Sequence, residues 1–122
     1  MNDNPTTWER RAFSVREITG AWREVSGMVC GPFCVFDWDH NGICWKEPMR
    51  ISVTHLPTGW RVCLAPHGAS AFQIVEGLMQ FADRFWRVVD PVDVSHTKDI
   101  APQIREIVSL HGGLTLSQRQ AA

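Results

Sequence analysis

The sequence predicts an α+β fold: an N-terminal helix, a four-stranded antiparallel meander, and two further helices, the first packed on the sheet. Three observations predict it. Apolar residues recur at helical spacing over residues 14–26, 71–86 and 99–111. Between the first two segments, residues 33–65 alternate apolar and polar side chains and contain two turn signals. No linker or repeat interrupts the 122 residues, which indicates one domain over 1–122.

The first helix is expected over residues 14–26. Ser14 and Glu17 have the spacing of a capping box, in which both side chains satisfy backbone groups at a helix start. One helical stripe would carry Val15, Ile18, Trp22 and Val25. Gly27 supplies a stop signal. Residues 1–12, which precede the helix, are expected to form an arm.

The first hairpin is expected to join a strand over 33–40 to a strand over 43–47. Asn41-Gly42 between alternating runs favours a type I′ turn, because that turn needs positive φ at both positions. In this register Trp38 faces Trp45 across the strands. The aromatic side chains then share one face, so the hairpin has an apolar side that needs a cover.

The second hairpin is expected to join strands over 50–56 and 60–65 through Pro57-Thr58-Gly59, with Gly59 in the left-handed position. The amphipathic helix over 71–86, which begins at a second capping box, covers the meander. Residues 88–94 are expected to be extended as an edge or a loop. A last helix over 99–111 is followed by a loose tail over 113–122, which leaves a core over about 13–112.

Charge and composition bound the function. Twelve basic and thirteen acidic residues give a formal net charge of −1, without the basic surplus of a nucleic-acid-binding domain. Three basic residues are expected on the sheet, Lys46, Arg50 and Arg61, and they keep a small nucleic-acid-binding regulatory protein as an alternative. No apolar run approaches the roughly 20 residues of a membrane helix, and the first residues lack the pattern of a signal peptide. The expected compartment is the cytoplasm, where the four cysteines would be reduced thiols unless they bind metal.

A metal site is the first alternative that the residues raise. The candidate zinc ligands are Cys30, Cys34, His40 and Cys44, since each pair has a spacing found in tetrahedral sites. The predicted hairpin opposes this site, because Cys44 points to the face opposite Cys34 and His40. Residues 37–42 also match the opening of a calcium-binding loop, but its twelfth position is Pro48 where a bidentate Glu is needed. No cofactor is therefore expected, and zinc is the alternative.

A catalytic site is the second alternative. Cys63, His55 and His67 could meet near the second hairpin, and a Cys–His pair makes a nucleophile. The sequence contains neither a nucleophile elbow nor an oxyanion loop beside them. We therefore rank a Cys/His-dependent enzyme below a protein-binding role and keep it as an alternative.

Protein binding is the favoured interpretation. Six tryptophans and six phenylalanines exceed what one helix-covered sheet readily hides, although tryptophans can also close the rim of a core. Exposed tryptophan near arginine is typical of binding hot spots. The candidate contact residues are Trp8 in the arm, Trp60 and Arg61 at a turn exit, and Trp86 and Arg87 at a helix end. They predict a non-enzymatic protein with a protein partner, and a homodimer is compatible with that prediction.

One stretch resembles a known group of proteins. Residues 51–60, Ile51-Ser52-Val53-Thr54-His55-Leu56-Pro57-Thr58-Gly59-Trp60, are followed by a short strand, a loop and an Ala/Phe-rich helix that ends at Trp86. This run resembles small uncharacterised proteins encoded by phages, plasmids and other bacterial mobile elements. The resemblance implies an accessory or inhibitor of the anti-CRISPR or anti-restriction kind, which occludes the surface of a larger protein. It carries over no catalytic residues.

Overall fold

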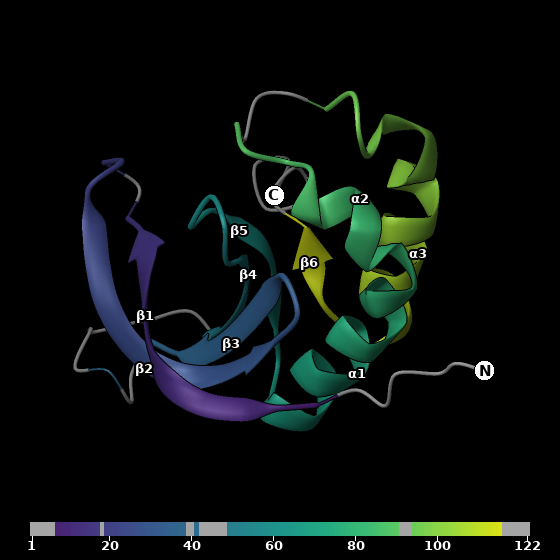
Figure 1. Cartoon of the computed structure of the whole chain (residues 1–122). Coiled ribbons are helices and arrows are strands. Elements are labelled where there is room, and N and C mark those ends of the chain that lie inside the picture. Colours follow the sequence, from purple (N-terminus) through teal and green to yellow (C-terminus); the bar gives the residue numbers. More distant parts are fainter. Residues whose placement is uncertain (1–6, 18, 39–40, 42–48, 91–93, 116–122) are drawn as a thin grey trace.

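The computed structural model describes residues 7–17, 19–38, 41, 49–90 and 94–115. Their strands form one antiparallel sheet in the order β1-β2-β3-β4-β5-β6, with the helices gathered on one side of it (Figure 1). The strands are β1 (Glu9–Arg16), β2 (Trp22–Cys30), β3 (Phe33–Asp37), β4 (Ile51–His55), β5 (Arg61–Ala65) and β6 (Leu114–Thr115). The helices are α1 (Gly68–Leu78), η1 (Met79–Phe81), α2 (Ala82–Trp86), η2 (Lys98–Ile100) and α3 (Ala101–Leu110). The α+β class is confirmed, but the predicted four-stranded meander behind an N-terminal helix is wrong.

The segment predicted as the N-terminal helix is a β-hairpin. β1 and β2 pair from Glu9 opposite Val29 to Arg16 opposite Trp22. The loop between them contains Gly20 at φ +89°, which suits a hairpin turn and not a helix interior. The apolar residues of 14–26 fit both the spacing of a helix and the alternation of a strand. Pairing of β2 with β3 selected the extended conformation. The predicted arm therefore contributes residues 9–12 to a strand.

The first predicted hairpin is also wrong, because β3 is an interior strand. β3 pairs with β2 on one side, where Val35 lies opposite Met28, and with β4 on the other, where Val35 lies opposite Val53. Both edges of residues 33–37 are thus occupied by strands other than 43–47. Residues 42–48, with the predicted partners of this hairpin, lie outside the described residues.

Asn41 has a different role from the predicted type I′ turn. None of the described non-glycine residues has the positive φ that this turn requires. The Asn41 side chain instead accepts a hydrogen bond from the Ser26 N–H (2.8 Å) and donates to the Ser26 carbonyl (3.1 Å) and to the Asp37 carbonyl (2.9 Å). The amide thereby extends the β2–β3 ladder beyond the end of β3.

The second hairpin has the predicted strands, β4 and β5. Gly59 lies at φ +74°, in the left-handed position that the sequence predicted for it. A register shift between Val53 and Thr54 places Arg61 opposite Thr54. The turn from Leu56 to Trp60 joins the strands.

The helices follow the predicted segments with different ends. The helix predicted over 71–86 is α1, η1 and α2, and it begins at Gly68 because His67 caps it by accepting the Ser70 N–H (3.2 Å). Residues 88–90 and 94, which were predicted to be extended, are not in a strand, and residues 91–93 lie outside the described residues. η2 and α3 replace the helix predicted over 99–111. The first residues of the predicted tail form β6, which pairs with β5, so the core extends beyond 112.

Side chains are buried on both faces of the sheet. α1 packs on β3, β4 and β5, and the buried cluster beneath it is Cys30, Phe33, Val35, Val53, Cys63, Ala65, Ala71, Ile74, Val75, Leu78, Phe85 and Val108. The opposite face holds a second cluster of Phe13, Val15, Val25, Val29, Cys34, Phe36 and Trp38. No helix covers this second cluster in the described part of the chain. The β1–β2 hairpin curls over it, as the lower left of Figure 1 shows.

Among the described residues, no helix has both the length and the apolar character needed to cross a membrane.

Candidate functional site

Three parts of the chain meet at the β4–β5 turn. On one side, the Arg16 N–H at the end of β1 donates to the Gly59 carbonyl (2.7 Å), so the curled hairpin closes against the turn. On the other side, the His55 ring joins the turn to the end of α2. The ring nitrogen Nδ1 bonds the Thr58 hydroxyl (2.8 Å), and Nε2 bonds the Phe85 carbonyl (2.7 Å). The turn is therefore held between the β1–β2 hairpin and α2.

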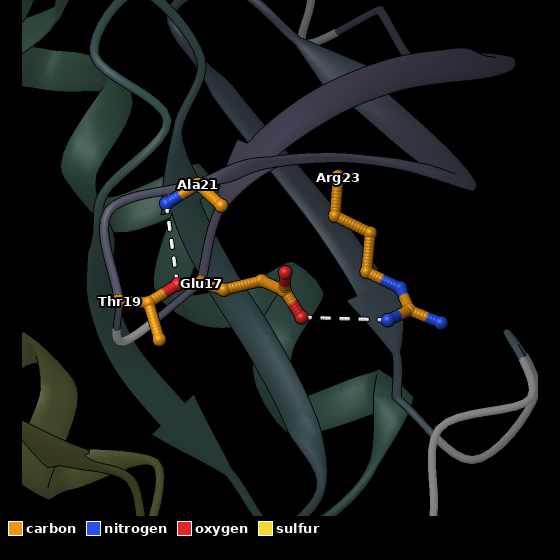
Figure 2. A network of polar contacts seen from close by, with 4 residues as sticks. All are labelled: Glu17, Thr19, Ala21 and Arg23. Carbon is orange, nitrogen blue, oxygen red and sulfur yellow. Dashed lines mark hydrogen bonds and ion pairs between the residues drawn. The ribbon is translucent and has the colours of Figure 1, made fainter.

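The tip of the β1–β2 hairpin is ordered by its own polar contacts. Figure 2 shows the Thr19 hydroxyl accepting the Ala21 N–H (3.4 Å) and the Arg23 guanidinium pairing with the Glu17 carboxylate (3.3 Å). The Glu17 N–H also donates to the Ala21 carbonyl (2.8 Å). These contacts position the residue that follows, Trp22, at the start of β2.

Trp22 is half-exposed but held firmly. Its ring lies under the Arg16 guanidinium, whose central carbon is 4.0 Å from the ring centroid, and Arg16 also donates to the Gly20 carbonyl (2.7 Å). The same ring lies against Gly59: a Cβ at Gly59 would be 2.4 Å from a ring carbon of Trp22. Half of the Trp22 surface (50%) still faces solvent. A large apolar ring is thus fixed at the surface beside the turn.

Trp86 is the last residue of α2. It follows Phe85, whose carbonyl is bonded to His55, and 51% of its surface is exposed. Val89 (83%) and Val94 (55%) are exposed in the segment after it. Arg84 anchors that segment through an ion pair with Asp99 (2.8 Å). We call Trp22, Gly59 and Trp86 the tryptophan rim.

The predicted contact residues lie in different environments. Trp8 is half-buried and meets Phe72 of α1 edge to face, with ring centroids 4.6 Å apart. Trp60 is half-buried beside Gly59, and its carbonyl accepts the His55 N–H (2.8 Å). Arg61 is half-buried, with its guanidinium 5.9 Å from the Trp38 ring centroid. Trp86 and Arg87 are exposed at the end of α2. Trp60 and Trp86 border the turn, whereas Trp8 closes the core beside α1.

Trp22 and Arg16 are the surface residues that sequence reasoning missed. The helical interpretation of residues 14–26 placed Trp22 on a buried stripe. In the observed hairpin, Arg16 lies directly opposite Trp22, which is what brings the guanidinium over the ring. Gly20 between two alternating runs was the signal that could have revealed this pairing.

The zinc candidates are divided between the two faces of the sheet. Cys30 belongs to the cluster under α1, and Cys34 belongs to the cluster under the β1–β2 hairpin. His40 and Cys44 lie outside the described residues. No three potential metal ligands gather among the residues that are described. Of the calcium-loop residues, Asp37 forms an ion pair with Arg50 (3.2 Å).

The candidates for Cys–His catalysis each have another structural role. Burial raises the pKa of Cys63 to about 12, so its sulfur is a thiol and not a thiolate at neutral pH. His55 bonds Thr58 and Phe85, and His67 caps α1. Within the described chain, no hydrogen bond joins Cys63 to a histidine. Nucleophilic chemistry therefore gains no support from these three residues.

The described cysteines should not react with thiol reagents in the folded protein. Burial raises the pKa of Cys30, Cys34 and Cys63, and all three side chains are almost fully enclosed. We expect peptide-resolved mass spectrometry to find them unmodified after iodoacetamide treatment at pH 8, and fully modified after unfolding in guanidinium chloride. Rapid alkylation of Cys63 in the folded protein would contradict this expectation and revive the catalytic alternative.

Comparison of the chain with models of protein families, with curated proteins and with solved structures finds no match.

Proposed function

We propose that the chain is a non-enzymatic, protein-binding accessory or inhibitor that acts in the cytoplasm by covering the surface of a partner protein through its tryptophan rim. The observation that carries the proposal is a pair of half-exposed tryptophans: Trp22 packs on Gly59 of the β4–β5 turn, and Trp86 follows Phe85, whose carbonyl is bonded to His55 beside the same turn. The resemblance of residues 51–86 to accessory proteins of mobile elements favours an inhibitor.

The chemistry of the rim suits protein recognition. Tryptophan and arginine are enriched among residues that carry most of the free energy of protein–protein binding. Trp22 is already oriented by Arg16 and Gly59, so a partner would not have to immobilise a free ring. Trp86, Val89 and Val94 are exposed apolar residues at and after the end of α2. A partner protein could bury the solvent-facing halves of both rings.

The test is capture of partners from the native host with the full-length protein and a Trp22→Ala/Trp86→Ala variant. We expect the double variant to lose at least about tenfold in affinity for the captured partner, since two anchor side chains are removed. Affinity is measured with the purified partner by titration calorimetry. Circular dichroism must show that the variant is folded.

Leu110→Ala is the matched control, because Leu110 is exposed (76%) on α3 and lies outside the rim. It should bind the partner with unchanged affinity. If the control weakens binding as much as the double variant, or if the double variant binds as tightly as the original chain, the rim is not the binding face. The variant Trp60→Ala should have an intermediate effect, because Trp60 is only half-buried beside the turn.

A further inference from the structure

β1 is an edge strand whose outer backbone groups have a known direction. The Arg16 N–H points away from β2, because it donates to Gly59 on the far side. In an antiparallel ladder the N–H and C=O of one residue point the same way, and alternate residues share that direction. The outward groups of β1 are therefore those of Arg10, Ala12, Ser14 and Arg16. Apart from Arg16, none of them bonds another described backbone group.

Among the described residues, the middle of this edge is open to strand pairing. Edge strands are commonly blunted by charged side chains, above all lysine, by proline or a bulge, or are covered by another element. β1 has eight residues with an uninterrupted register and neither lysine nor proline, and its charged residues, Glu9, Arg10, Arg11 and Arg16, lie toward its two ends. Ala12 and Ser14 are small and exposed, so they leave room for another strand.

A second β1 complements this edge in one register. With a two-fold axis at Ala12, Ala12 faces its own copy and Arg10 faces Ser14 of the second copy. Each of these couples exchanges a pair of backbone hydrogen bonds through the outward groups. Moving the axis to Arg11 sets Arg11 opposite itself, and moving it to Phe13 sets Arg10 opposite Arg16. Like charges directly opposite each other destabilise a strand pair, so the axis at Ala12 is favoured.

Charges on the neighbouring strand support the same register. Ser14 lies opposite Glu24 of β2, so Glu24, Ser14 and Arg10 of the second copy form one row across three strands. Strands are about 4.8 Å apart, so Glu24 and Arg10 can meet over the small Ser14 side chain. On the other face, Val15 lies between Arg23 and Glu9 of the second copy, but Val15 is buried and Arg23 already pairs with Glu17, so that row adds no ion pair. The axis repeats the row of Glu24, Ser14 and Arg10, which gives two opposite-charge rows.

We infer that two copies of the chain associate through their β1 edges, antiparallel and centred on Ala12, to form one continuous sheet. The occupant of the edge is thus a second copy of this chain. The association uses residues 9–15 of the β1 edge and ends at Arg16, where the β4–β5 turn occupies the edge. It does not depend on the proposed function.

Multi-angle light scattering and sedimentation equilibrium of the full chain test the inference. We expect a mass of twice 13.8 kDa, and the mass of one chain for Ala12→Pro. Proline removes the outward N–H of residue 12 but no bond to β2, so circular dichroism and thermal unfolding should be unchanged. The dimer dissociation constant should rise at least about a hundredfold, because two central hydrogen bonds are lost and the ring obstructs the edge. Ala12→Ser, which keeps the N–H, is the matched control and should stay dimeric.

A charge swap and a disulfide test the register. Arg10→Glu should weaken the dimer by about tenfold, and adding Glu24→Arg should restore it. In a Cys44→Ser background, mild oxidation should link Ala12→Cys chains, since residues on the axis are within disulfide reach of their own copies. Ser14→Cys should not link to itself, because Arg10 lies opposite it.

A wild-type chain that stays monomeric at about 0.5 mM overturns the inference, since a specific strand-paired dimer should form well below that concentration. Dimers of Ala12→Pro, or equal linking of Ser14→Cys, also overturn it. Trp22→Ala/Trp86→Ala should remain dimeric, so failure of the rim as a partner site and failure of the β1 dimer are separately visible.

Discussion

Replacing Gly27 with alanine should destabilise the protein by about 3 kcal/mol, at the upper end of the range for overpacking a tightly packed site. A Cβ on Gly27 would lie 2.2 Å from the Val35 carbonyl oxygen and 2.9 Å from the Phe36 Cβ. Both atoms belong to β3, which is held between β2 and β4 and cannot move alone. The close approach occurs where the β1–β2 hairpin curls over the second cluster. Thermal unfolding should shift down by about 10 °C.

Gly68→Ala is the control for this prediction. Gly68 is the first residue of α1, and a Cβ there would find its nearest neighbour, a ring carbon of Phe72, 4.0 Å away. Alanine also favours the helix over glycine by up to about 1 kcal/mol. The same chemical change should therefore stabilise one site slightly and strongly destabilise the other. Equal effects at both sites would show that the sheet does not approach itself closely at Gly27.

The second large effect is expected for His55→Ala. The ring is buried, and its removal would leave the Phe85 carbonyl and the Thr58 hydroxyl without their partner. Together with the cavity, these losses should cost about 3 kcal/mol in the free energy of unfolding, measured by urea denaturation. His55→Gln should cost less, because its amide N–H can still donate to the Phe85 carbonyl. If alanine and glutamine cost the same, the bond to Phe85 contributes little.

His55 should also make the fold sensitive to acid. Burial lowers the pKa of His55 from its ordinary value of 6.5, although the hydrogen bond to Phe85 opposes the shift. The unfolded chain then binds a proton at a higher pH than the folded chain. The contribution to stability is present above pH 6.5 and is lost as the pH falls below that value toward the lowered pKa. His55→Gln should flatten this part of the stability–pH curve, and an unchanged slope would assign the acid sensitivity to other groups.

These two residues explain how the candidate site is built. Gly27 permits the hairpin to curl, and the curl brings Arg16 and Trp22 to the β4–β5 turn. His55 ties the same turn to α2, whose last residue is Trp86. Variants at either position should weaken partner binding indirectly, through loss of the fold. Trp22→Ala/Trp86→Ala should do so with the fold intact, which separates the rim from its support.

Parts of the fold were predictable because their signals are local. The β4–β5 hairpin followed from Pro57-Thr58-Gly59 between two alternating runs, and Gly59 has the predicted left-handed φ. The helices over 68–86 followed from a long apolar stripe, whose buried side faces β3, β4 and β5. Trp86 was predicted as a contact residue from its place at a helix end and is half-exposed. The conformation of a tight turn, and that of a helix whose apolar stripe exceeds three turns, depend mainly on their own residues and little on the rest of the chain.

The sequence by itself determined the α+β class, the helix over the sheet and the left-handed turn at Gly59. Only the tertiary structure decided that residues 9–16 and 22–30 are strands, that β3 is interior, and that Trp22 packs against the β4–β5 turn. The physical reason is that an extended strand has no stable partner within its own segment. Its hydrogen bonds and its buried face come from residues far along the chain, so a short segment with mixed periods adopts the conformation that the sheet can complete.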